Sequence, residues 1–189
     1  MRLLRTLLCL PMILAACNKP HPADTSETPV VVFTGSGFSL EPGPGWIRLD
    51  TRKISQPIQQ LICQPALTTK GVTIQVAQVG DRISEEAALA GVAAAMEADE
   101  LAVKDSLTKV DFQSDSGVKG KIIRYTRHTA PDPKRVLNIL TQYLVRNSGG
   151  RWVSIGAHSD NVELANEVDA MVKRTLREVP RPTPTPRPK

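Results

Sequence analysis

Histidine, serine, cysteine and acidic side chains could each carry chemistry in this 189-residue chain, but they do not fall into a catalytic pattern. The histidines His21, His128 and His158 are not spaced as metal ligands, and no HExxH motif is present. Gly35-Ser36-Gly37 lacks the last glycine of a dinucleotide-binding loop and indicates a turn. No GxSxG, SxxK or P-loop sequence occurs. The sequence therefore predicts no enzyme activity, no metal and no cofactor.

Cys17 is the residue whose surroundings predict a reaction. Arg2 and Arg5 precede an apolar run, residues 6–16, which is the layout of a secretory signal peptide and is shorter than the ~20 residues that span a bilayer. The run ends in Leu14-Ala15-Ala16-Cys17, which resembles the lipobox of bacterial lipoproteins. The resemblance implies that the Cys17 thiol is alkylated with a diacylglycerol, that residues 1–16 are removed, and that acyl chains hold the protein on a membrane. The alternative is an ordinary secreted protein.

Asn18 bears on which membrane carries the protein. In the sorting pattern that this sequence resembles, an aspartate at this position retains a lipoprotein at the inner membrane. Its absence favours the outer membrane, facing the periplasm, and the inner membrane is the alternative.

Composition divides the rest of the chain into a tether, one domain and a tail. Residues 17–29 are polar and predict a disordered tether, residues 30–179 predict a single domain, and residues 180–189 form a proline-rich basic tail. Two of the five net positive charges leave with the signal peptide, and aromatic residues are only 4% of the chain, so nucleic acid is not a predicted partner. Cys63, in an apolar run, predicts a buried thiol without a disulfide partner.

Alternating and β-branched runs predict strands, and two turn clusters predict hairpins. The hairpin turns are Asp115-Ser116-Gly117 and Asn147-Ser148-Gly149-Gly150. The predicted strands cover 30–33, 38–41, 46–49, 58–63, 72–79, 107–114, 118–128, 137–146 and 152–157. Two segments have helical spacing instead: one is capped by Ser84 and runs through 87–104, and the other follows Asp160 and ends before Pro180. This order predicts an α+β domain, a mostly antiparallel sheet with helices packed on it.

The element order and the sequence Pro42-Gly43-Pro44-Gly45-Trp46 resemble the PsbP-like family, which includes the DcrB-like bacterial lipoproteins. The similarity covers roughly residues 30–179. It implies an α/β/α sandwich that serves as a binding scaffold and shares no catalytic motif, so it implies no site residues.

A cluster of cations near the middle of the domain is a candidate partner-binding surface. Its residues are Lys119, Lys121, Tyr125, Arg127, Lys134 and Arg135. Four of them share one face of a predicted strand, and an anionic lipid headgroup, a cell-wall carboxylate or an acidic protein would suit this surface. The alternative is a solvated sheet face on which Ile123 and Tyr125 pack under a helix.

The sequence as a whole predicts a non-catalytic, lipid-anchored binding or assembly module of the bacterial envelope. Its partners would be the membrane, through the N-terminal lipid, and an unknown envelope protein. An alternative is an immunity or inhibitor lipoprotein that neutralises a secreted toxin, and a minor hydrolase is a third hypothesis.

Overall fold

The structure is a computed structural model that describes residues 31–33, 37–43, 46–49, 58–64, 72–81, 83–128 and 137–179. The strands are β1 (Val31–Phe33), β2 (Phe38–Leu40), β3 (Ile47–Leu49), β4 (Ile58–Gln64), β5 (Val72–Asp81), β6 (Thr108–Gln113), β7 (Lys119–His128), β8 (Leu137–Arg146), β9 (Arg151–Ser159) and β10 (Arg177–Glu178). The helices are α1 (Glu85–Glu97) and α2 (Val162–Thr175). The predicted signal peptide, Cys17, tether and proline-rich tail lie outside the described residues.

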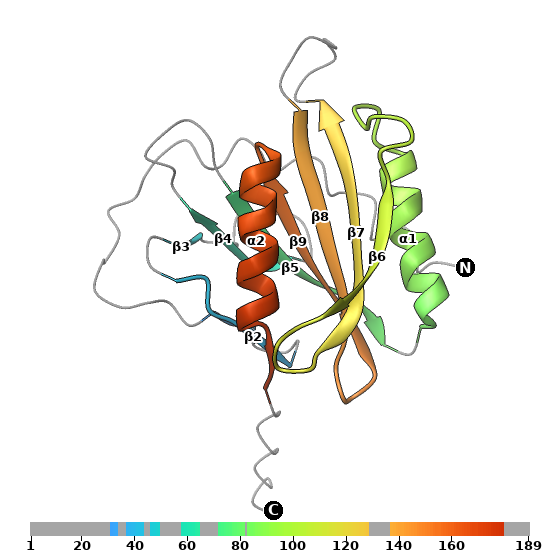
Figure 1. Cartoon of the computed structure of the whole chain (residues 1–189). Helices are drawn as coiled ribbons and strands as arrows, with labels where there is room; N and C mark the ends of the chain where they lie inside the picture. The colour runs from blue at the N-terminus through green and yellow to red at the C-terminus, as the bar shows by residue number, and fades with distance from the viewer. Residues whose placement is uncertain are drawn as a thin grey trace, which may run out of the picture.

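Seven strands form one antiparallel sheet in the order β3-β4-β5-β9-β8-β7-β6 (Figure 1). The strands β1, β2 and β10 form a smaller sheet. The two predicted hairpins, β6–β7 and β8–β9, build one side of the large sheet. Their turns contain Gly117 and Gly150, whose positive φ angles of 90° and 79° favour glycine. β5 pairs with β9 along its whole length, which joins the early strands to the hairpins. These pairings confirm the predicted α+β class with a mostly antiparallel sheet.

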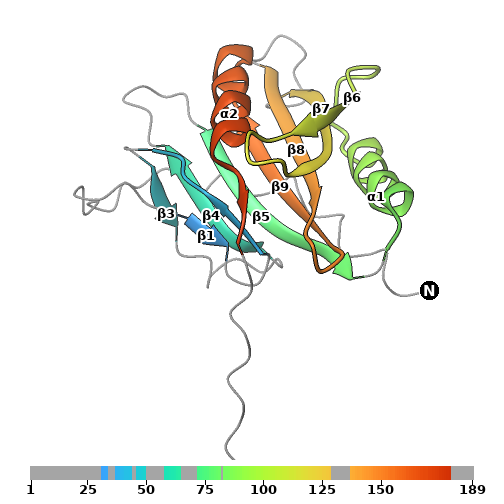
Figure 2. The same cartoon turned by 60° about the horizontal axis from the view of Figure 1, so that its bottom comes forward.

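The two helices pack on opposite faces of the seven-stranded sheet, as Figures 1 and 2 show. Successive side chains of a strand point to opposite faces. Tyr143 of β8 therefore lies in the cluster under α2 with Val172, whereas the next residue, Leu144, lies with Ala88 of α1. β8 is buried on both faces, and the domain has the expected α/β/α layering.

Each helix differs from the prediction at one end. Ser84 caps α1 as predicted, but the helix stops at Glu97 instead of reaching Lys104, because Asp99 turns inward. α2 is capped by Asn161 rather than by Asp160, since the Asn161 side chain accepts the bond from the Leu164 N–H. Within the described part of the chain, neither helix has the length and apolar composition that a membrane span requires.

Candidate functional site

The β6–β7 hairpin carries Lys119 and Lys121, two residues of the predicted surface that are not buried, and its turn is fixed to the end of α2. The Asp115 N–H donates to the Lys173 carbonyl at 2.9 Å, and the Ser116 hydroxyl donates to the Leu176 carbonyl at 2.7 Å. The Ser114 hydroxyl also accepts from the Val118 N–H at 3.1 Å. These bonds hold the hairpin in place, so the side chains near its turn are presented by a rigid element.

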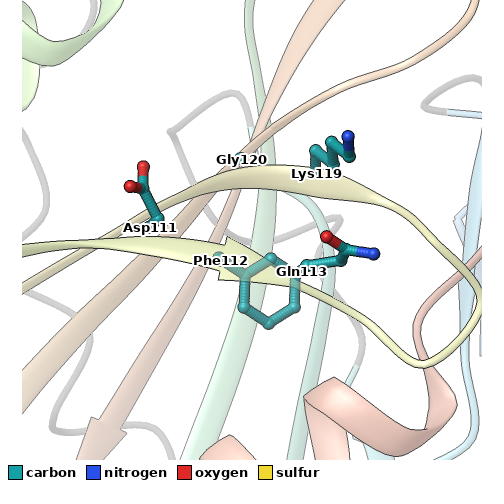
Figure 3. Close-up of a pocket in the computed structure, with 5 residues that line it drawn as sticks. All are labelled: Asp111, Phe112, Gln113, Lys119 and Gly120. Atoms are coloured by element: carbon teal, nitrogen blue, oxygen red, sulfur yellow. The ribbon is translucent and has the colours of Figure 1, made fainter.

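A hollow of about 320 Å³ lies beside this hairpin. It is lined by Asp111, Phe112, Gln113, Lys119 and Gly120. Figure 3 shows Asp111 and Lys119 rising from the two strands on one side of the ribbon, with the Phe112 ring on the other. The Phe112 ring is buried and meets the Tyr143 ring edge-on, with 5.6 Å between centroids. The hollow is thus lined by the Lys119 ammonium, the Gln113 amide and the Asp111 carboxylate, next to the buried Phe112 ring.

Lys119 and Lys121, both predicted for the partner surface, differ in how much of their charge is free. Lys119 is exposed and has no ion-pair partner among the described residues. Lys121 Nζ lies 2.5 Å from Asp111 Oδ1 and 3.6 Å from Glu85 Oε1, and the hydrogen bond to Asp111 raises the pKa of Lys121. Of these two lysines, Lys119 is therefore the one whose charge a partner can neutralise.

Tyr125 and Arg127 do not belong to the molecular surface, which corrects the predicted set. Both side chains are buried, because the segment after α1 covers this end of β7. Arg127 Nε donates to Asp99 Oδ2 at 2.8 Å, and the Tyr125 hydroxyl lies 3.5 Å from the same oxygen. Burial raises the pKa of Tyr125, so its hydroxyl stays protonated. These two residues join the sheet to the chain beyond α1, whereas the alternative interpretation expected Tyr125 to pack under a helix.

The remaining predicted site residues fall outside the part of the molecule that can be described. Lys134 and Arg135 lie in the 129–136 gap, and Cys17 precedes the first described residue. Cys63 lies in β4 opposite Ile47 and Thr73, and the burial of its thiol stays a prediction.

Three buried polar atoms within the described ranges have no hydrogen-bond partner: Asn138 Oδ1, His158 Nε2 and His128 Nδ1. Asn138 stands opposite Arg127 in the β7–β8 register and is 2% exposed. Burial lowers the pKa of His158, and the nearby charge of Arg127 lowers it further against the opposing effect of Asp160. Ordered water commonly satisfies such atoms. In the described ranges, no three histidine, cysteine or acidic residues come close enough to hold a metal ion.

A second charged network fixes α2 to the other face of the sheet. Asp169 of α2 accepts hydrogen bonds from the Arg124 guanidinium and from the Tyr143 hydroxyl. Arg124 Nε also donates to Thr141 at 3.0 Å. Tyr143 is fully buried, and burial raises its pKa. The network links β7, β8 and α2, and its members serve packing rather than an open site.

Asp111 is a residue of the site that the sequence analysis did not name, although the sequence indicates its position. Asp111 stands opposite Lys121 once the hairpin turn at residues 115–117 sets the register. The pairing of the exposed carboxylate with Lys121 therefore followed from the predicted turn. Asp99 meets Arg127 only through tertiary packing, and no local pattern marks it or the buried polar atoms of Asn138 and His158.

No known family model matches this chain, and no curated protein matches it. One similar solved structure is a protein from Bacteroides thetaiotaomicron VPI-5482, with a TM-score of 0.48 and 11% sequence identity. The match covers 76% of this chain and 46% of that one, so the chain corresponds to about half of the other protein's length. The resemblance to the PsbP-like family stays a prediction.

Proposed function

We propose that this chain is a lipid-anchored, periplasm-facing binding or assembly module of a bacterial envelope, and that it acts by contact rather than by catalysis. The anchoring part of the proposal is supported by Arg2 and Arg5, by the apolar run that follows them, and by the Leu14-Ala15-Ala16-Cys17 sequence. Two acyl chains are enough for stable attachment without a spanning helix.

The observation that carries the contact part is the rigid hairpin, with its hollow and the unpaired Lys119 at the rim of that hollow. Arg127 and Arg124 are engaged by Asp99 and Asp169, so their charges stabilise the fold. Lys119 at the rim of the hollow is exposed, and Gln113 beside it adds an amide that can donate and accept. A partner that presents a carboxylate to this rim would satisfy both groups, which favours an acidic envelope protein.

The test is site-specific photocrosslinking in intact cells of the host. A photoreactive side chain at Gln113 should yield a defined crosslinked envelope protein, whereas the same probe at Glu163, exposed at the first turn of α2, should not. Lys119→Glu should remove the product, and Lys104→Glu, at an exposed position beside the opposite end of β7, should retain it. Equal products from both probe positions, or no product at Gln113, would contradict the proposed contact surface.

A further inference from the structure

β6 is the last strand of the seven-stranded sheet, and within the described residues no strand pairs with its outer edge. Every side chain of β6 except Phe112 is exposed. An edge strand presents a row of backbone N–H and C=O groups that can pair with another strand. β6 is six residues long, whereas β3 at the opposite edge has three. The longer edge is the better template for strand addition.

The side chains at the centre of β6 are one cation, one aliphatic group and one anion. Val110 is 54% exposed. Among the residues that the structure describes, the other exposed large hydrophobic residue is Val162, at 59%. Asp111 lies on the α1 side of the sheet because it contacts Lys121, which in turn contacts Glu85. Strand alternation places Lys109 on that same side and Val110 on the α2 side. Lys109 has no ion-pair partner in the described part of the chain.

This order of charges is complementary to itself in one antiparallel register. Directly opposite residues in antiparallel strands point to the same face, so a two-fold axis between two copies of β6 must pass through a pair of identical residues. An axis at Lys109 sets two cations opposite each other, and an axis at Asp111 sets two carboxylates opposite each other. An axis at Val110 sets Lys109 of each copy opposite Asp111 of the other and brings the two exposed valines together. Opposite charges across strands stabilise a pair and like charges destabilise it.

We propose that two copies of this chain associate through their β6 strands, antiparallel about a two-fold axis at Val110. The two seven-stranded sheets then form one continuous sheet, with the α1 helices on one face and the α2 helices on the other. Asp111 of each copy would lie between its own Lys121 and Lys109 of the other copy. The association depends on neither the lipid anchor nor the envelope partner. Because a six-residue edge is short, the interface belongs to the small, weak class.

Disulfide crosslinking tests the axis directly. Cα atoms of directly opposite residues are about 4.5–5.5 Å apart in an antiparallel pair, which falls inside the range of about 4.4–6.8 Å that a disulfide spans. The purified full chain with Val110→Cys should form a covalent dimer under mild oxidation. Val162→Cys, equally exposed but on α2, should not, and the unchanged chain controls for Cys9, Cys17 and Cys63. Equal crosslinking of the two variants, or none at Val110→Cys, would overturn the proposal.

A charge-reversal pair tests the register. Lys109→Asp places two anions opposite each other in the homodimer, and Asp111→Lys places two cations opposite each other, so each variant should self-associate roughly tenfold more weakly than the unchanged chain. An equimolar mixture restores both opposite-charge pairs and should associate as the unchanged chain does. Sedimentation equilibrium of the full chains, alone and mixed, measures this difference. Two variants that dimerise as well as the unchanged chain, or a mixture no stronger than its components, would refute pairing in this register.

Discussion

Arg127 and Lys121 lie on the same face of β7, yet burial gives their charges different roles. Arg127 and Asp99 are 7% and 8% exposed, and their ion pair is isolated from water. Lys121 meets Asp111 in the open, where solvent screens the attraction. Removing one partner of a buried pair leaves an uncompensated charge in the interior, whereas removing an exposed partner does not.

We predict that Arg127→Met lowers the free energy of unfolding by about 3–5 kcal/mol, because Asp99 would remain buried without its cation. Lys121→Met removes the same type of charge from the same strand face and should leave the unfolding midpoint nearly unchanged. Urea denaturation of both variants measures the difference. Equal losses in the two variants would show that the Asp99–Arg127 pair contributes no more than the surface pair.

His158 makes stability depend on pH. Burial lowers its pKa below the ordinary value of 6.5. The unfolded chain therefore takes up the proton at a higher pH than the folded chain, so stability is full above about pH 6.5 and falls as the pH drops toward the folded pKa. We predict that His158→Gln removes this part of the acid destabilisation. The stability of the variant relative to the unchanged chain, measured by urea unfolding between pH 7.5 and pH 5, should rise as the pH falls; a constant difference would contradict the prediction.

Cys17 carries the prediction about attachment. Lipid transfer requires a sulfur nucleophile, and a hydroxyl is a much weaker nucleophile at neutral pH. We predict that Cys17→Ser abolishes labelling by a fatty-acid analogue and releases the protein from the membrane fraction. If the variant carries label and stays in the membrane through a high-salt wash, the lipobox interpretation is wrong. Retention without label would instead indicate an uncleaved signal peptide as the anchor.

At the scale of elements, the hairpins were predictable because short runs of turn-forming residues specify their turns. The turns at residues 115–117 and 147–150 set the registers of β6–β7 and β8–β9. The end of α1 was not predictable, since alanine-rich spacing continues past Glu97 and only the buried contact of Asp99 with Arg127 shows why the chain turns. β10 was missed because two residues carry no strand pattern and pair with a distant β2. The buried position of Tyr125 and Arg127 depends on the chain that covers them, which no strand pattern reveals.

The hairpin holds one position at which no side chain fits. A Cβ atom on Gly120 would lie 2.2 Å from the carbonyl oxygen of Leu144 in the paired strand. We predict that Gly120→Ala destabilises the domain by about 1–3 kcal/mol, because the backbones of β7 and β8 must separate. Lys119→Ala, at the exposed neighbouring position, should have little effect on the melting temperature. If Gly120→Ala melts with the unchanged chain, the close approach of the two strands is not as described.

At the scale of the whole molecule, the two ends of the described domain meet. β10 pairs with β2, and the Val179 N–H donates to the Gly37 carbonyl at 2.8 Å. Leu176, between α2 and β10, is fully buried in the cluster that contains Phe38 and Leu40. The last described residues thus complete the core that the first ones begin.

We predict that Leu176→Ala lowers the free energy of unfolding by about 2–5 kcal/mol, since it opens a cavity where the early strands meet α2. Arg177→Ala should be tolerated, because that side chain is exposed and its pairing with Ser39 uses the backbone. The melting temperatures of the two variants compare a buried position with the exposed position next to it. A larger loss for Arg177→Ala would mean that β10 stabilises the domain through its side chains instead.

The late closure of this core has a consequence for the order in which the protein can form. A ribosome releases Phe38 and Leu40 long before Val172 and Leu176, so the apolar groups of β2 must wait for their partners. The central β5–β9 pairing imposes the same delay, because its strands are separated in the chain by α1, β6, β7 and β8. Contacts between distant parts of a chain slow folding. A nascent chain with this topology cannot complete its core before α2 has left the ribosome, which would suit the unfolded state that the predicted signal peptide requires for passage through a membrane.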